Sequence, residues 1–211
     1  LNGVTFDILK GSRAVLLGEN GCGKTTLLRL ISRLEKPTRG VILQNIDDKF
    51  GQKSKQSNKW YKKVGVVYQN PDYQLFMPTV EKEIKFGAKS DEYADEIAEK
   101  FGIKHLYARH PQSLSEGQKR RVSIAAVVAT DPEVLILDEP TVGQDYKGLC
   151  EMVEVLNRIH EETHNTMITV THDKRCAAAL CDRSVWIKDG KTYKTGGKEL
   201  VDEFFIQIGR N

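Results

Sequence analysis

A glycine-rich loop near the N-terminus constrains the fold more than any other feature of this sequence. The apolar run Ala14 to Leu17 leads into it, and a helical pattern from Thr25 to Leu34 follows it. Strand, glycine-rich loop and helix in this order are the context that the phosphate-binding P-loop pattern requires, and a chance glycine-rich turn would lack that context. Glycines let successive N–H groups converge on phosphates, the helix N-terminus adds positive potential, and Lys24 can reach the terminal phosphates. The sequence therefore predicts a nucleotide-binding loop formed by Gly18, Glu19, Asn20, Gly21, Cys22, Gly23, Lys24, Thr25 and Thr26, with the Thr25 hydroxyl as a ligand of Mg²⁺.

Three further apolar runs share the character of the first. They are Val64 to Tyr68, Val134 to Leu137 and Met167 to Thr171. Because their apolar residues are continuous rather than alternating, they predict strands covered on both faces, as in parallel sheets. Helical patterns lie between them, at residues 92–101, 116–129 and 149–163. The sequence thus predicts an α/β fold of the P-loop NTPase type, with a mostly parallel core sheet and a small antiparallel β portion.

Length and composition set the domain organisation. The chain has 211 residues, 39% of them hydrophobic, which is enough for one sizeable domain, so residues 1–211 are expected to form a single domain. The mainly helical pattern between residues 71 and 129 predicts a helical subdomain inserted into the α/β core. The net charge of +3 does not call for a nucleic-acid partner. The sequence shows neither an apolar membrane span nor a signal peptide, so we expect any membrane role to be peripheral, at the cytoplasmic face of the cell membrane.

Two adjacent acids, Asp138 and Glu139, follow the apolar run that ends at Leu137. Asp138 suits the Mg²⁺ site, through a water molecule, because magnesium keeps several waters and accepts few carboxylates. Glu139 is then free to act as a general base that orients or deprotonates the attacking water. An ordinary acidic turn is the alternative, and it loses force in a chain that also carries a P-loop.

The segment from Leu114 to Gln118 opens the helical pattern that continues to residue 129. Ser115 with Gln118 three residues later predicts a capping box, and a capped helix N-terminus with N–H groups and a hydroxyl is an anion site. The pentapeptide also resembles the signature of the ATP-binding cassette (ABC) family. In that family two ATPase domains dimerise head to tail. The resemblance implies that Ser115, Gly117 and Gln118 bind the nucleotide held by the P-loop of the partner.

The resemblance extends over nearly the whole chain and implies ATP and Mg²⁺ as the bound molecules. By this resemblance Gln69 contacts the metal and water, Asp145 communicates across the dimer, and His172 binds the γ-phosphate and holds Glu139 or the water. Taken singly, Gln69 or His172 would more often be just a polar residue at a strand end. The resemblance therefore implies Glu139, His172 and Gln69 as catalytic residues and Thr25, Gln69 and Asp138 as metal ligands.

Within the family, the segments at residues 69–76, 78–80 and 83–87 resemble the energy-coupling-factor importers of the cobalt and vitamin type. The resemblance implies an ATPase subunit that couples dimer closure and ATP hydrolysis to import. Its partners would be a second ATPase subunit or domain, identical or different, and integral membrane transporter subunits. Leu75, Phe76 and Met77 are expected to dock a helix of the membrane partner. The segments at residues 119–121, 139–141 and 143–145 also resemble the second half of tandem ATPases, and the adenine-stacking aromatic residue is expected upstream of Leu1.

One residue departs from the family pattern, and two alternative functions have to be considered. Glu116 replaces the commoner glycine of the signature, which suggests an asymmetric pair of ATPases. The alternative function is a soluble ABC ATPase acting on DNA or ribosomes, but the chain has no long coiled coil between its nucleotide-binding motifs and no second cassette. A regulatory module without turnover is disfavoured because Glu139 and His172 are both present. The lysine-rich stretch at residues 49–63 is expected to be an exposed hairpin or loop.

Overall fold

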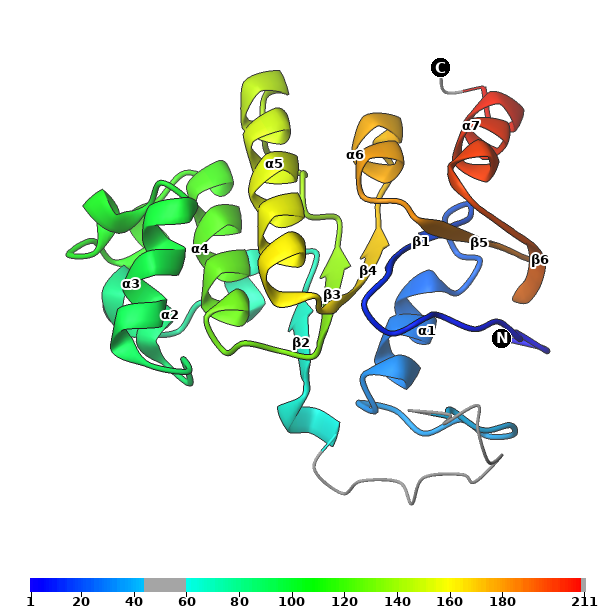
Figure 1. Ribbon diagram of the computed structural model, residues 1–211, viewed down its shortest axis with the longest axis horizontal. Helices are drawn as coiled ribbons and strands as arrows, with labels where there is room; N and C mark the ends of the chain where they lie inside the picture. The colour runs from blue at the N-terminus through cyan, green and yellow to red at the C-terminus, as the bar shows by residue number, and fades with distance from the viewer. Residues whose placement is uncertain (44–59, 210–211) are drawn as a thin grey trace.

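The computed structural model of the chain describes residues 1–43 and 60–209 (Figure 1). Most of the lysine-rich stretch at residues 49–63 lies outside the described residues. Its end forms a 3₁₀ turn, η1 (Trp60–Lys62), and the indole N–H of Trp60 donates a hydrogen bond to the carbonyl of Ile31 at 3.1 Å. No helix in the described ranges is long and apolar enough to cross a bilayer.

The described strands form one sheet at the centre of the molecule, in the order β2-β3-β4-β1-β5-β6. Neighbouring strands run parallel except β5 and β6, which pair antiparallel, so the expected mostly parallel sheet with a small antiparallel portion is confirmed. The strands are β1 (Arg13–Leu17), β2 (Val64–Val67), β3 (Val134–Asp138), β4 (Thr166–Val170), β5 (Arg183–Lys188) and β6 (Lys191–Gly196).

Helices cover both faces of this sheet, as the continuous apolar runs predict (Figure 1). In β1, Leu16 packs in a cluster with Leu27 and Leu28 of the helix on one face, whereas Val15 and Leu17 pack with helices on the other face. The helix on the first face is α1 (Lys24–Ile31), and those on the second are α5 (Tyr146–Thr163), α6 (Lys174–Ala179) and α7 (Lys198–Gln207).

The helical subdomain lies beside the β2 edge of the sheet (Figure 1). Its apolar core is continuous with the sheet, because Ile84, Ile97 and Ile124 share one buried cluster with Leu135 and Leu137 of β3. Its elements are η2 (Pro71–Tyr73), α2 (Val80–Lys85), α3 (Asp91–Lys100), η3 (Lys104–Leu106), η4 (Pro111–Ser113) and α4 (Glu116–Val128).

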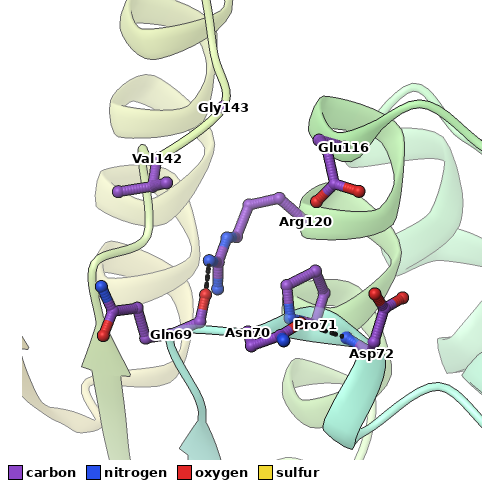
Figure 2. A pocket seen from close by; sticks show the side chains of 8 residues that line it. All are labelled: Gln69, Asn70, Pro71, Asp72, Glu116, Arg120, Val142 and Gly143. Atoms are coloured by element: carbon purple, nitrogen blue, oxygen red, sulfur yellow. Dashed lines mark hydrogen bonds between the residues drawn. The ribbon is translucent and has the colours of Figure 1, made fainter.

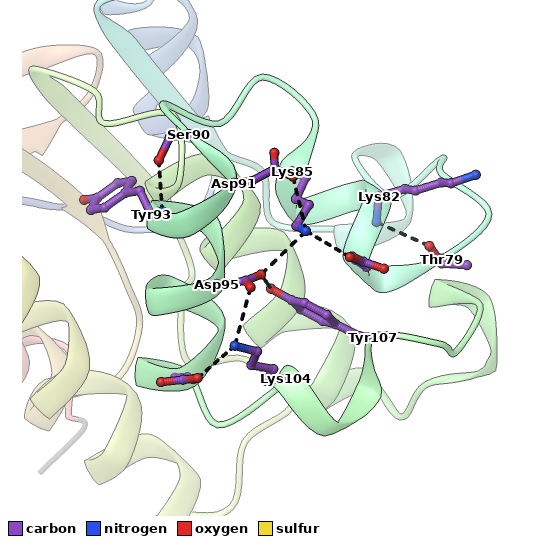
Figure 3. Close-up of polar contacts among 11 residues, drawn as sticks. Thr79, Lys82, Lys85, Ser90, Asp91, Tyr93, Asp95, Lys104 and Tyr107 are labelled. Atoms are coloured by element: carbon purple, nitrogen blue, oxygen red, sulfur yellow. Dashed lines mark hydrogen bonds and ion pairs between the residues drawn. The ribbon is translucent and has the colours of Figure 1, made fainter.

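A polar cluster joins α2, α3 and the segment after η3 (Figure 3). Lys85 Nζ lies 2.9 Å from Glu81 and 3.3 Å from Asp91, and the Tyr107 hydroxyl donates to Asp95 at 2.8 Å. Burial and the Asp95 carboxylate raise the pKa of Tyr107, so the hydroxyl keeps its proton and remains a donor. The cluster fixes the two helices relative to each other.

Element ends differ slightly from the sequence prediction, for local reasons. The strand expected to reach Tyr68 ends at Val67, because the Tyr68 N–H donates to Gln74 Oε1 instead of continuing the ladder. The helix expected from residue 149 starts at Tyr146, because Asp145 Oδ1 accepts the N–H of Gly148 and caps it. The helix expected to reach Leu34 ends at Ile31, where the chain turns through positive φ at Arg33.

Candidate nucleotide-binding and catalytic site

The P-loop begins directly after β1 and is shaped by two glycines. A Cβ at Gly18 would lie 2.6 Å from the carbonyl oxygen of Ile187, so only glycine fits there. Gly23 precedes α1 with a φ of 106°, in the left-handed region, and gives α1 no side-chain cap. The first N–H groups of α1, including those of Thr25 and Thr26, are therefore left to an anion at the helix N-terminus.

Lys24, the first residue of α1, is buried beneath this loop. Its ammonium donates to the carbonyl of Gly18 at 2.6 Å and to that of Glu19 at 2.9 Å. The charge is held inside the ring of loop backbone where phosphate oxygens are expected. Cys22 also lies in the loop, with its sulfur 4.0 Å from Lys24 Nζ, and fills a small-residue position.

Asp138 and Glu139 stand at the end of β3, two strands from β1, and both are buried. Burial raises the pKa of each carboxyl above its ordinary value, against the opposing attraction of Lys24. Glu139 has a φ of 54°, a conformation rare for a side chain of its size, and its N–H donates to the carbonyl of Val170 at 2.8 Å. The backbone of Glu139 is thus tied to the end of β4.

His172 follows β4 and meets that carboxylate. Its backbone N–H donates to Glu139 Oε2 at 3.2 Å, and its ring Nε2 lies 3.6 Å from Glu139 Oε1. Within the described residues, the buried Oε1 accepts no hydrogen bond. A buried carboxylate with an unused acceptor is suited to take a proton from a water molecule.

Gln69 follows β2, the neighbour of β3, and its side chain is exposed. Its backbone is held by a residue that the sequence analysis did not select, Arg120 of α4. The Arg120 guanidinium donates to the carbonyl of Tyr68 at 2.7 Å. It also donates to the carbonyl of Gln69, the bond drawn in Figure 2.

The signature segment, residues 114–118, forms the start of α4. The expected capping box is confirmed, because the Gln118 N–H donates to Ser115 Oγ at 3.4 Å and the Ser115 N–H donates to Gln118 Oε1 at 3.1 Å. Gly117 accepts a hydrogen bond from the Gln144 side chain at 2.9 Å. No hydrogen bond or ion pair between described residues joins Ser115, Gly117 or Gln118 to the P-loop.

The fold brings together residues that are far apart in sequence. β1, β2, β3 and β4 are parallel, so Gly18, Gln69, Asp138 and His172 all lie at carboxyl ends of strands, at one edge of the sheet. Ligands of open α/β sheets bind at that edge. Asp145 serves as the N-cap of α5. Its expected role across a dimer stays a prediction.

The sequence analysis missed three buried charged groups, Lys119, Arg120 and Glu83. Glu83 of α2 accepts the N–H groups of Phe76 and Met77 through Oε2, at 2.9 and 2.7 Å. Glu83 and Arg120 both bind backbone groups, which leave no pattern in the sequence.

The docking prediction for residues 75–77 needs a correction. Leu75 is only 4% exposed and belongs to the core of the helical subdomain. Phe76 is 66% exposed and packs edge-on against Phe86, with ring centroids 5.2 Å apart. Leu75 therefore stabilises the turn from inside, and Phe76 with Phe86 forms its outer surface.

Comparison with known families decides the affiliation of the chain. The profile of the ABC transporter family matches residues 1–142. The chain belongs to the ABC transporter family. Membership confirms the resemblance drawn from the signature segment, and the P-loop fold agrees with it.

Relatives and solved structures refine the position of this ABC chain. The energy-coupling factor transporter ATP-binding protein EcfA2 of Enterococcus faecalis is 40% identical over 214 residues, covering 94% of this chain and 72% of the relative. The structure of cbiO1 from Clostridium perfringens, part of the ABC transporter complex cbiONQ, is 31% identical with a TM-score of 0.80 and covers 100% of this chain and 89% of that one. A dimeric structure of the ATP-binding cassette MJ0796 bound to ADP and Pi is 26% identical with a TM-score of 0.78, covering 92% and 89%. These neighbours agree with the expected energy-coupling-factor group and do not favour an ATPase of DNA or ribosomes.

Proposed function

We propose that the chain is the ATP-binding and ATP-hydrolysing subunit of an importer of the energy-coupling-factor type. One observation carries the proposal: the P-loop with Lys24 and the pair Glu139 and His172 lie at the same edge of the sheet. Such an edge holds a phosphate chain and a group that activates water within reach of each other.

The residues at this edge fit Mg²⁺ together with ATP. Thr25, Gln69 and Asp138 offer hydroxyl, amide and carboxylate oxygens, which are the ligands that magnesium prefers. Mg²⁺ would neutralise charge on the phosphates and polarise the transferred phosphoryl group. Lys24 and the uncapped start of α1 would bind the phosphates.

The chemistry assigned to Glu139 is proton removal from water. Oxygen of the water attacks the γ-phosphorus, Glu139 Oε1 takes the proton, and the bond between the γ-phosphorus and the bridging oxygen breaks, with its electron pair passing to ADP. His172 holds Glu139 through its backbone N–H and directs its ring toward the same oxygen.

A second ATPase, identical or different, would complete the site. The signature segment forms the start of α4, and no hydrogen bond or ion pair of the described residues joins it to the P-loop of its own chain. Ser115, Gly117 and Gln118 would therefore meet a nucleotide held by a partner. The dimeric assembly of the neighbour MJ0796 supports this arrangement. Asp145, at the start of α5, would communicate across such a dimer.

Phe76 and Phe86 supply the contact with the membrane subunits. Two exposed aromatic rings in edge contact form an apolar surface, and Glu83 fixes the turn that presents it. Attachment through this surface would place the chain peripherally at the cytoplasmic face of the membrane.

Reconstitution tests the proposal. The protein is combined with its ATPase partner and the membrane subunits in lipid vesicles, and ATP-dependent uptake is measured together with phosphate release. Uptake that stops without Mg-ATP is expected. Phosphate release without any association with integral membrane subunits would favour the soluble ABC ATPase instead.

A further inference from the structure

Arg120 is an unusual residue to find inside the helical subdomain. It lies one turn into α4 and is only 2% exposed, and its side chain is among the largest that are fully buried. Arginine is almost never buried to this extent unless its charge is matched by specific partners. The hydrogen-bond partners of Arg120 therefore indicate the role of its buried charge.

Those partners are backbone carbonyls at the end of β2. The two terminal nitrogens of Arg120 donate to the adjacent residues Tyr68 and Gln69, and Figure 2 shows the bond to Gln69. Neither bond goes to a carboxylate, and the buried Nε has no acceptor among the described residues. Asp138 and Glu139 act on Arg120 at longer range, since they oppose the lowering of its pKa that burial causes. Among the described residues, the hydrogen bonds of the guanidinium are therefore all made to the backbone at the start of the segment that follows β2.

The neighbouring lysine makes a second link between the same two elements. Lys119 Nζ lies 2.8 Å from Asp72, in η2, and 3.6 Å from Glu116. Lys119 is buried although it is a lysine. Two successive residues of α4 therefore hold the segment that runs from Tyr68 to Asp72, and Figure 2 shows both elements lining one pocket.

The Gln69 side chain is left available by this arrangement. Its amide points away from Arg120, which holds only the backbone carbonyl (Figure 2). Ser115, Gly117 and Gln118 lie at the other end of the same link, in the first turn of α4 and its cap. A displacement of α4 must move the backbone of Gln69 unless the Arg120 bonds break.

We propose that Arg120 is a positioning residue that couples the signature segment, at the nucleotide of the partner, to Gln69 at the nucleotide of its own chain. This inference rests on the proposed function, because it assigns the two ends of the link to two nucleotides. In the dimer, seating the signature segment on one ATP sets the orientation of Gln69 at the other.

Arginine suits this role for a geometric reason. Its planar guanidinium offers N–H donors at a fixed spacing, so it can donate to two successive carbonyls at once. A lysine carries all its donors on one ammonium nitrogen and cannot match that spacing. An apolar side chain would fill the same space without a buried charge, but it would leave both carbonyls unbound.

A double-mutant cycle on turnover tests the coupling. Arg120→Met, Gln69→Ala and the double variant are compared in the full ATPase complex, with Arg121→Met as the matched control, since Arg121 pairs with Glu151 on α5 instead. Arg120→Met is expected to lower kcat about tenfold or more while KM for ATP changes less than about threefold. Because Arg120 acts through Gln69, the double variant should be no slower than Gln69→Ala alone. Losses that multiply would overturn the coupling.

Hydrogen exchange tests the link without any turnover. In the nucleotide-free protein, Arg120→Met should speed amide exchange in residues 68–72 by about tenfold or more, and Arg121→Met should not. Unchanged exchange would overturn the inference. Accelerated exchange in a protein that hydrolyses no ATP would instead refute the proposed function and leave the positioning of Gln69 by Arg120 standing.

Folding of the variant is controlled by a second substitution. Arg120→Lys keeps the charge and most of the stem but cannot hold both carbonyls. It should retain a melting temperature close to that of the wild type and still show the accelerated exchange and the loss of kcat. Wild-type exchange and kcat in Arg120→Lys would show that only the charge matters, and would contradict the positioning role.

Discussion

Glu139 and His172 are joined by two contacts, one to each oxygen of the carboxylate. Oε2 accepts the backbone N–H of His172 at 3.2 Å, and Oε1 lies 3.6 Å from the ring nitrogen Nε2. The backbone contact fixes the carboxylate, whereas the buried Oε1 accepts no hydrogen bond from the described residues. A base must be held firmly yet keep one acceptor unused, and this pair satisfies both requirements.

Replacing Glu139 by glutamine should separate binding from hydrolysis. Glu139→Gln keeps the size of the side chain but removes its basicity, so we expect ATP binding to survive and phosphate release to fall by roughly 10²-fold or more. ATP should then persist in a closed dimer, visible by gel filtration with Mg-ATP. Glu133→Gln, at the opposite end of β3, is the control and should hydrolyse normally. Near-normal hydrolysis by Glu139→Gln would shift the role of base to His172 or to the substrate.

Removing the P-loop lysine should produce a defect of a different kind. Lys24→Ala takes away the cation that neutralises the terminal phosphates, so nucleotide binding itself should be lost and the protein should not dimerise with ATP. Equilibrium binding of a fluorescent ATP analogue measures this directly. Lys194→Ala, which removes an exposed partner of Glu203, should bind normally. Tight binding by Lys24→Ala would show that the backbone of the loop suffices.

The exposed aromatic pair can be tested without disturbing the nucleotide site. Phe76→Asp places a charge on the outer surface next to Phe86, and it should abolish assembly with the membrane subunits while ATP still binds. Ile206→Asp changes an equally exposed apolar residue on α7 and should assemble normally. A Phe76→Asp protein that fails to fold, judged by its thermal unfolding, would assign the ring to the core instead.

Glu116 is expected to make the two nucleotide sites of the complex unequal. Its carboxylate is exposed within the signature segment and lies 3.6 Å from Lys119 Nζ. At fixed geometry a carboxylate near a γ-phosphate costs about 1 kcal/mol, so Glu116→Gln should tighten ATP binding at the completed site by roughly fivefold. ATP-binding isotherms of the dimer, with wild-type Glu116 and with Glu116→Gln, measure the change. Two sites with equal turnover in the wild-type complex would contradict the asymmetry.

The stability of the sheet should depend on pH through Asp182. The Arg13 guanidinium, 2.5 Å away, holds the pKa of this carboxyl below its ordinary value. The folded state therefore favours the ionised form, and the stabilisation is complete above the unfolded pKa of about 3.9 and lost as pH falls through the lower folded value. Because the pair is partly exposed, Asp182→Asn should cost at most about 1 kcal/mol at pH 7. Urea unfolding should show this cost shrinking at strongly acidic pH, whereas Asp202→Asn should show little cost at either pH. A cost for Asp182→Asn that stays constant down to pH 2 would rule out the ion pair as its source.

Local sequence determined the elements and the identity of most site residues. The continuous apolar runs predicted β1 to β4, because strands covered on both faces must be apolar throughout. The P-loop and the capping box are equally local, since each is completed within a few residues of backbone. The sequence analysis did not assign β6, because this strand is mostly polar and exposed and gives no comparable pattern.

Only the tertiary structure decided how these pieces meet. The strand order places the residues after β1, β2, β3 and β4 at one edge, and no single segment specifies that order. In the sequence Arg120 and Glu83 are indistinguishable from ordinary surface charges, yet both are buried. Arg120 donates to the backbone carbonyls of Tyr68 and Gln69. Glu83 accepts the backbone N–H groups of Phe76 and Met77. Every residue carries the same backbone groups, so which of them a buried charge will bind depends on the packing of distant segments and not on any local pattern.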